Sequence, residues 1–123
     1  MTAGGVVVVA RYGGTVELLA GLLRSADVLV CRTAAFDRDE EVVVARILRA
    51  AVDEQQAVVT VLSPADPTLD RLRALSSDPP PVVAVTWHPR DEWPACASLV
   101  ARAVPAGQIS RDLASAVRAI LPR

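Results

Sequence analysis

Side chains that could do chemistry follow three short apolar runs of the chain. They are Arg11 and Tyr12 after the first run, Ser63 after the third, and Thr86, Trp87 and His88 after the fourth. A serine near a histidine offers a nucleophile with a general base, and a guanidinium beside hydroxyl groups offers an anion site. No aspartate is evidently placed to orient His88, so a solvent-facing loop histidine is the simpler interpretation.

Two interpretations of Arg11 stay open. The guanidinium can act as a built-in cation that bonds to Ser63, Thr86 or a bound anion. Alternatively, Arg11 points to solvent from a loop. Trp87 and Trp93 are similarly ambiguous, because large aromatic side chains serve either as contact anchors on a surface or as ordinary packing.

The residues give little support for a phosphate-binding loop or a metal site. The glycine pair at residues 13–14 lacks the spacing of a phosphate loop, and the thirteen basic residues are all arginine, so the lysine of such a loop is missing. Cys31 and Cys96 are far apart, and a single histidine cannot complete a zinc site with them. We expect no metal and no cofactor.

The runs that precede these side chains predict strands of a parallel sheet. Residues 6–9, 28–31, 58–62 and 82–85 are apolar at every position except Thr60, which is typical of strands that are buried on both faces. A weaker fifth strand fits residues 103–106, where Pro105 removes a hydrogen-bond donor and favours an edge position.

Amphipathic segments between the strands predict helices. Leucines at helical spacing indicate a helix at residues 15–24, and the helices that follow are recognised by capping residues. We expect these starts at Asp37 with Glu40 as a capping box, at Asp66 with Pro67 in the first turn, at Asp91 or Glu92 for a helix through Val100, and at Ser110.

The order of these elements predicts one α/β domain over residues 1–123. Because crossovers between parallel strands are right-handed, a strand–helix unit repeated five times forms a doubly wound, flavodoxin-like sheet with strand order 2-1-3-4-5. Ligands of such sheets bind where the carboxyl ends of strands 1, 3 and 4 meet, which we call the carboxyl edge. The chemically interesting side chains all follow strands that end there.

Composition excludes several classes of protein. The chain has 123 residues, of which 52% are apolar and 3% aromatic, so Val, Leu, Ile and Ala must fill the core. Its net charge of −1, with acids interleaved among the arginines, provides no basic face for direct nucleic-acid binding. The valine run at residues 6–9 is too short for a membrane span, and no charged segment of a signal peptide precedes it. We expect a cytoplasmic protein with reduced thiols.

The segment SPADPTLDRLRAL at residues 63–75 resembles the response-regulator receiver family. In that family the phosphoacceptor aspartate is followed four residues later by proline and then by an Asp–x–Leu pattern. Ser63 stands at the phosphoacceptor position, Pro67 at the proline, and Asp70 and Leu72 at the pattern beyond it.

Two further segments support this resemblance. PVVAVTWHPRDE at residues 81–92 is similar to the fourth strand of the family, which ends in a switch threonine or serine that Thr86 matches. ISRDLASAVRAIL at residues 109–121 resembles the closing helix. The first half of the chain matches the family only in layout.

The chain departs from the family at three of four functional positions. The acidic pair that holds Mg²⁺ falls on residues 10–11, which are Ala and Arg, and the phosphoacceptor falls on Ser63. The lysine position falls at about residues 106–107, where the chain has Ala and Gly; only Thr86 is retained. A serine cannot form an acyl phosphate, and a guanidinium repels a divalent cation.

The resemblance therefore implies an atypical receiver that works without phosphorylation as a regulatory domain, for example in a transcription regulator. It would respond to a protein partner or a small-molecule effector and would not be an enzyme. In the family, the surface matching residues 93–121 mediates dimerisation, so we expect a homodimer through Trp93, Leu99, Val100, Leu113 and Val117. The alternatives are a small flavodoxin-like enzyme or nucleotide-binding domain that uses Ser63, Thr86 and His88, and a scaffold without a ligand.

Overall fold

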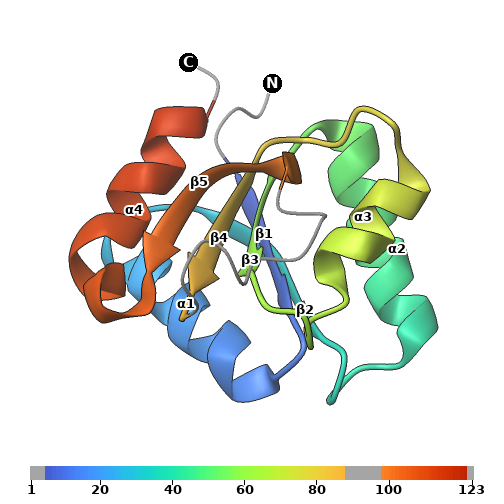
Figure 1. The fold of residues 1–123 in the computed structure, drawn as a ribbon, viewed down its shortest axis with the longest axis horizontal. Helices are drawn as coiled ribbons and strands as arrows, with labels where there is room; N and C mark the ends of the chain where they lie inside the picture. Colours follow the sequence, from blue (N-terminus) through green and yellow to red (C-terminus); the bar gives the residue numbers. More distant parts are fainter. Residues whose placement is uncertain (1–4, 88–97, 122–123) are drawn as a thin grey trace.

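A computed structural model shows an α/β protein built on one parallel sheet, described here for residues 5–87 and 98–121. Its strand order is β2-β1-β3-β4-β5, and every neighbouring pair is parallel, as in flavodoxin-like folds (Figure 1). The predicted fold class and strand order are confirmed. The strands are β1 (Val6–Ala10), β2 (Val30–Ala35), β3 (Ala57–Val61), β4 (Val82–Thr86) and β5 (Val100–Pro105).

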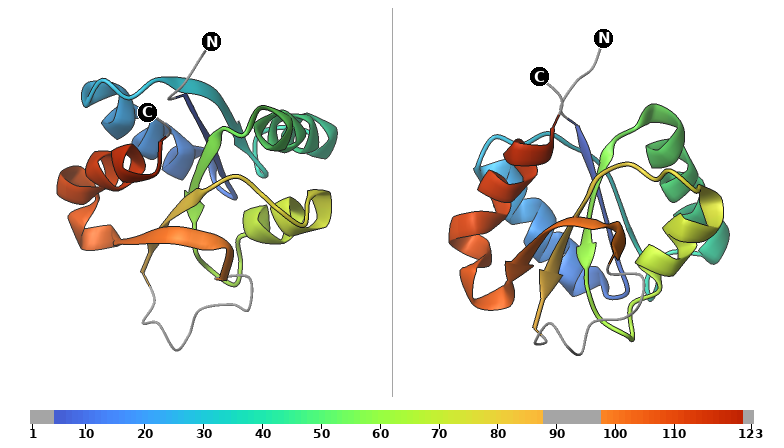
Figure 2. Two further views of the ribbon diagram at one scale, coloured as in Figure 1. Left: turned by 90° about the horizontal axis from the view of Figure 1, so that it is seen from above. Right: turned by 45° about the horizontal axis from the view of Figure 1, so that its top comes forward.

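Helices cover both faces of the sheet. Helices α1 and α4 pack on one face, and α2 and α3 pack on the other (Figures 1 and 2). The helices are α1 (Gly13–Ser25), α2 (Glu41–Glu54), α3 (Thr68–Leu75) and α4 (Ile109–Ile120), and the short 3₁₀ turn η3 (Ala106–Gln108) leads into α4.

The inner strands β1, β3 and β4 are apolar at nearly every position because successive side chains enter two separate cores. Val6 and Val8 pack with α1 and α4, whereas Val7 and Val9 pack with α2 and α3. All four valines have no exposed surface. Complete burial of a valine side chain stabilises the folded state by roughly 1.5–3 kcal/mol. The valines of β1 therefore stabilise the middle of the sheet.

The predicted bounds of β2 and β5 were wrong by several residues. Strand β2 continues to Ala35 instead of ending at Cys31, because it is an edge strand whose polar residues Arg32 and Thr33 are only partly buried. Strand β5 begins at Val100, so the helix expected to run through Val100 cannot extend that far. Pro105 does lie on an edge strand, at its last position.

The predicted helix caps at Asp37 and Ser110 were also wrong. Helix α2 begins at Glu41 with Glu40 as its N-cap, and Asp37 instead accepts a 2.8 Å hydrogen bond from the backbone N–H of Gly13. Helix α4 begins at Ile109, which places Ser110 within its first turn. The side chain of Asp37 is directed by a neighbour 24 positions away along the chain, which a local pattern does not contain.

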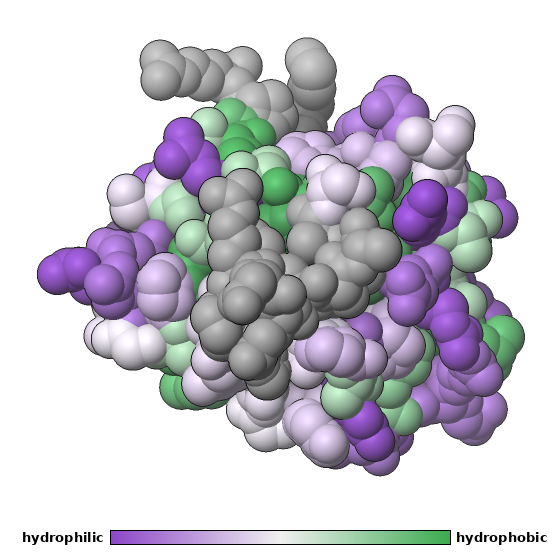
Figure 3. Space-filling model, in the orientation of Figure 1, coloured by the Kyte–Doolittle hydropathy of each residue, from purple (hydrophilic) through white to green (hydrophobic). Residues whose placement is uncertain are grey.

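The outer surface is largely polar over α2 and α3, where purple side chains prevail on the right of Figure 3. Within the described ranges, every helix is too short or too polar to cross a membrane.

Candidate functional site

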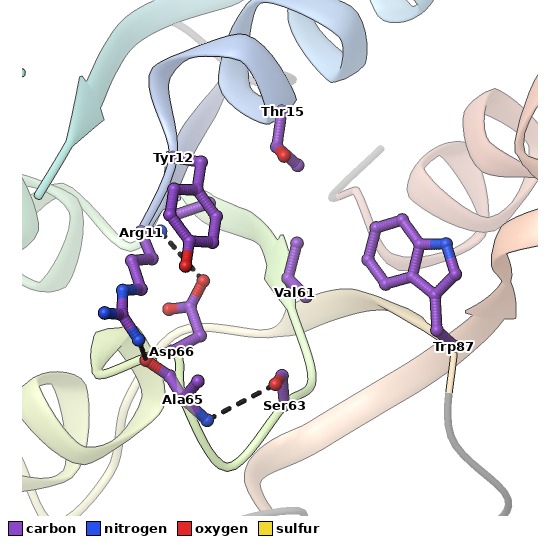
Figure 4. A pocket seen from close by; sticks show the side chains of 9 residues that line it. Arg11, Tyr12, Thr15, Val61, Ser63, Ala65, Asp66 and Trp87 are labelled. Atoms are coloured by element: carbon purple, nitrogen blue, oxygen red, sulfur yellow. Dashed lines mark hydrogen bonds between the residues drawn. The ribbon is translucent and has the colours of Figure 1, made fainter. Parts of the chain in front are cut away.

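A cavity of about 240 Å³ opens at the carboxyl edge, between the ends of β1 and β3 (Figure 4). Its position agrees with the switch-point rule for parallel sheets, because the strand order reverses between β1 and β3. We call it the edge cavity; it is lined by Ala10, Arg11, Tyr12, Thr15, Val61, Ser63, Ala65, Asp66 and Trp87.

Asp66 organises the polar side of the edge cavity. Its side chain is buried, and Oδ2 accepts a 2.8 Å hydrogen bond from the backbone N–H of Arg11. Oδ1 accepts two more, from the backbone N–H of Thr68 at 3.0 Å and from its hydroxyl at 2.7 Å. The carboxylate therefore ties the end of β1 to the start of α3 and has both oxygens engaged.

The helix cap predicted at Asp66 is only part of what its side chain does in the structure. The cap function itself is partly right, since Asp66 does accept from the N–H of Thr68, although Pro67 and not Asp66 is the N-cap. The contact with Arg11 joins residues that are 55 positions apart. The usable signal was the place of Asp66, an acid in the short loop between a strand at the switch point and its helix.

The guanidinium of Arg11 bonds to a backbone carbonyl group, whereas the hydroxyl of Ser63 was one of the partners considered for it. Its guanidinium donates a 3.0 Å hydrogen bond to the carbonyl oxygen of Ala65 and lies 5.2 Å from the centre of the Tyr12 ring. Arg11 is exposed, and in the described part of the chain it makes no side-chain hydrogen bond to Ser63. The hydrogen bond to Ala65 stabilises the loop between β3 and α3, and the guanidinium remains exposed to solvent.

Ser63 and Thr86 occupy the edge but in different settings. Ser63 Oγ lines the edge cavity and accepts a 3.3 Å hydrogen bond from the backbone N–H of Ala65, so its own hydrogen can be donated to another group. Thr86 is buried at the last position of β4, beside Pro105 of β5. His88 lies outside the described residues.

Two aromatic rings flank the edge cavity. Tyr12 comes from the end of β1 and Trp87 from the end of β4, and Figure 4 shows their rings on either side of Val61. Their exposed fractions are 54% and 58%, in a chain with only 3% aromatic residues. Both rings are accessible from solvent, and the apolar side chain of Val61 lines the cavity between them.

Charged groups of the β2–α2 loop support the start of α1 beside the cavity. Arg38 bonds to Asp39 and to Glu17 of α1, and both carboxylates raise the pKa of Arg38. Asp39 accepts a 2.9 Å hydrogen bond from the backbone N–H of Ala35. That bond is the largest influence on the pKa of Asp39 and lowers it; burial, the next largest, raises it, and the contact with Arg38 lowers it again, so the pKa lies below its ordinary value.

The residues expected at a dimer face are not all on the surface. Leu113 and Val117 have no exposed area, because they face the core shared by α1 and α4, so assigning them to a partner face was wrong. Leu99 and Val100 are partly buried against the opposite core. Trp93 lies outside the described residues.

The described residues do not assemble a cluster of three or more His, Cys, Asp or Glu side chains that could hold a metal ion. Cys31 is exposed on β2, where the side chain of Gln56 contacts its sulfur at 3.3 Å. Comparisons of the chain with protein-family models, with curated proteins and with solved structures found no match.

Proposed function

We propose that the chain is a receiver-like regulatory domain that works without phosphorylation, as part of a signalling protein such as a cytoplasmic transcription regulator. The observation that carries this proposal is the edge cavity. It lies at the carboxyl edge, and it holds a serine and an arginine where the receiver resemblance requires a phosphoacceptor and a metal-binding acid. Its signal would be a bound small molecule or protein segment.

The arrangement around Asp66 argues against receiver phosphorylation. Transfer of a phosphoryl group to a carboxylate needs a free oxygen and a cation that neutralises the phosphoryl oxygens. Both oxygens of Asp66 accept hydrogen bonds, and the adjacent position carries the guanidinium of Arg11, which would repel Mg²⁺. Ser63 could form only a phosphate ester, which lacks the reactivity of an acyl phosphate.

Regulation would proceed by a shift between two packings of the carboxyl edge. Trp87 lines the edge cavity and directly follows β4, whose last residue, Thr86, lies beside β5. A ligand that contacts Trp87 is thus coupled by a short path to β5 and α4. The two packings would differ at Thr86 and Trp87.

The output of this shift would be self-association through β5 and α4. A groove of about 310 Å³ between these elements is lined by small and polar side chains, among them Ala103, Ser115 and Ala119. These residues replace Leu113 and Val117 as the expected contact face. Sedimentation equilibrium at high micromolar concentration should show dimers, and a monomer throughout would contradict this part of the proposal.

The phosphorylation-independent mechanism is tested with acetyl phosphate and Mg²⁺, using a working receiver domain as the positive control. We expect no acid-labile phosphate on the chain and no thermal stabilisation by Mg²⁺ with beryllofluoride. Hydroxylamine-sensitive labelling would contradict the proposal. Strong stabilisation by FMN or a nucleotide would instead favour the small flavodoxin-like enzyme or nucleotide-binding domain.

A further inference from the structure

The chemistry of the edge cavity indicates what kind of molecule it binds, an inference that rests on the proposed ligand-sensing function. We propose that the cavity takes a small, planar, uncharged heteroaromatic molecule, held between the rings of Tyr12 and Trp87. Three properties of the cavity carry this step: its size, its flanking rings and the state of its charged groups.

Size limits the ligand to about two fused rings. The cavity of about 240 Å³ is smaller than the roughly 300–1,000 Å³ of pockets that enclose drug-sized ligands. A molecule of about ten non-hydrogen atoms is therefore a suitable probe, whereas a complete flavin mononucleotide or dinucleotide would extend far into solvent.

The flanking rings favour a flat aromatic shape over a compact saturated one. Tyr12 and Trp87 stand on either side of Val61, with Ala10 and Ala65 completing an apolar lining (Figure 4). Aromatic groups gain most from offset or edge-to-face contact with other rings. A flat aromatic molecule that contacts both Tyr12 and Trp87 would gain two ring–ring contacts.

The polar groups select an uncharged ligand with a hydrogen-bond acceptor. The carboxylate of Asp66 already accepts three hydrogen bonds, from Arg11 and Thr68, which occupy most of its roughly four acceptor sites. The guanidinium of Arg11 is exposed and turned to the carbonyl of Ala65, where water screens its attraction for an anion. The hydroxyl of Ser63, by contrast, can donate to an acceptor nitrogen or oxygen.

The test is titration of the ¹⁵N-labelled full chain at neutral pH with two neutral acceptor molecules of similar size. Quinoline is planar and aromatic, and camphor is a saturated bicyclic ketone. We expect quinoline to shift the amide signals of Thr15, Ser63 and Ala65, with a dissociation constant of about 1 mM as suits so small a ligand. Camphor should leave these signals unchanged.

Variants then locate the binding. Trp87→Ala and Tyr12→Ala should each weaken quinoline binding by about tenfold, the loss typical of one ring-stacking contact. Both side chains are more than half exposed, so the spectra of the variants should keep their folded dispersion. Val42→Ala removes an equally exposed apolar side chain, 58%, from α2 and should bind quinoline like the unmodified chain.

Each other outcome has a definite meaning. Camphor binding as tightly as quinoline overturns the aromatic class but leaves the proposed ligand-sensing function intact. Binding of neither molecule, or binding that survives both ring substitutions, overturns the inference itself. A response of the same amides to Mg²⁺ with beryllofluoride would instead overturn the proposed function.

Discussion

The interior of the sheet and its carboxyl edge differ in the kind of side chain that they bury. In the interior of β1 and β4, valine and alanine fill both faces and the backbone supplies the hydrogen bonds. At the edge, Asp66, Thr68 and Thr86 are also buried, and the contacts of Asp66 and Thr68 join parts of the chain that are remote in sequence.

This difference determines how each region responds to change. An apolar interior depends mainly on the area and volume of its side chains, so similar residues replace one another at moderate cost. A buried polar group depends on the identity and direction of each partner, because an unpaired donor or acceptor loses its hydration without replacement. Precise placement at the edge is what a binding site requires.

The largest effect should come from Asp66→Ala. This change leaves the backbone N–H groups of Arg11 and Thr68 without their acceptor, and we expect a loss of about 2–3 kcal/mol in the free energy of unfolding. Urea denaturation followed by circular dichroism measures it.

The exposed acid Asp53 of α2 supplies the control for that measurement. Asp53→Ala should change stability by no more than about 0.5 kcal/mol. Asp66→Asn should be intermediate, because one amide oxygen can still accept from Thr68 while the amide nitrogen faces the Arg11 donor. Equal stability of Asp66→Ala and Asp53→Ala would show that the edge is not organised by Asp66.

Two buried threonines provide a matched pair across the two regions. Thr60 and Thr68 both have no exposed area, but among the described residues the hydroxyl of Thr60 has no hydrogen-bond partner, whereas that of Thr68 bonds to Asp66. Valine has nearly the same shape without the polar oxygen. Thr60→Val should therefore stabilise the chain by about 1 kcal/mol, and Thr68→Val should destabilise it by about 1–2 kcal/mol.

Thermal and urea unfolding of both variants test the pair together. A destabilised Thr60→Val would mean that its hydroxyl is satisfied in solution. A neutral Thr68→Val would mean that the contact with Asp66 contributes little, and the contrast between interior and edge would be lost.

The same contrast explains how far the sequence predicts the structure. The strand order follows from apolar runs such as residues 6–9 and 82–85, because burial on both faces leaves a mark at every position. The side chains at the carboxyl edge follow no comparable sequence pattern. Asp37, expected as a helix cap, bonds to Gly13, and the contact between Asp66 and Arg11 is invisible to any local pattern. The place of the site was predictable from topology, but its hydrogen bonds were not.

The smallest expected effect concerns pH and is confined to the edge. Asp39 follows β2, and the hydrogen bond from the N–H of Ala35, with help from Arg38, holds its pKa below the ordinary value. Its folded pKa is thus lower than its unfolded one, so its contribution to stability is present above the ordinary aspartate pKa of about 3.9 and is lost as pH falls through the folded value.

Asp39→Asn should accordingly unfold with a shallower loss of stability between neutral pH and about pH 3, by less than about 1 kcal/mol. Arg38→Gln should change the pH dependence less, because the bond from Ala35 is the larger cause of the lowered pKa. Urea unfolding of the three proteins across this range measures the difference. An unchanged profile in Asp39→Asn would assign the acid sensitivity to other carboxylates. The inner strands hold only valine, alanine and threonine, none of which titrates, so any such sensitivity must arise outside them. Its size at Asp39 measures how far the edge behaves differently from the interior.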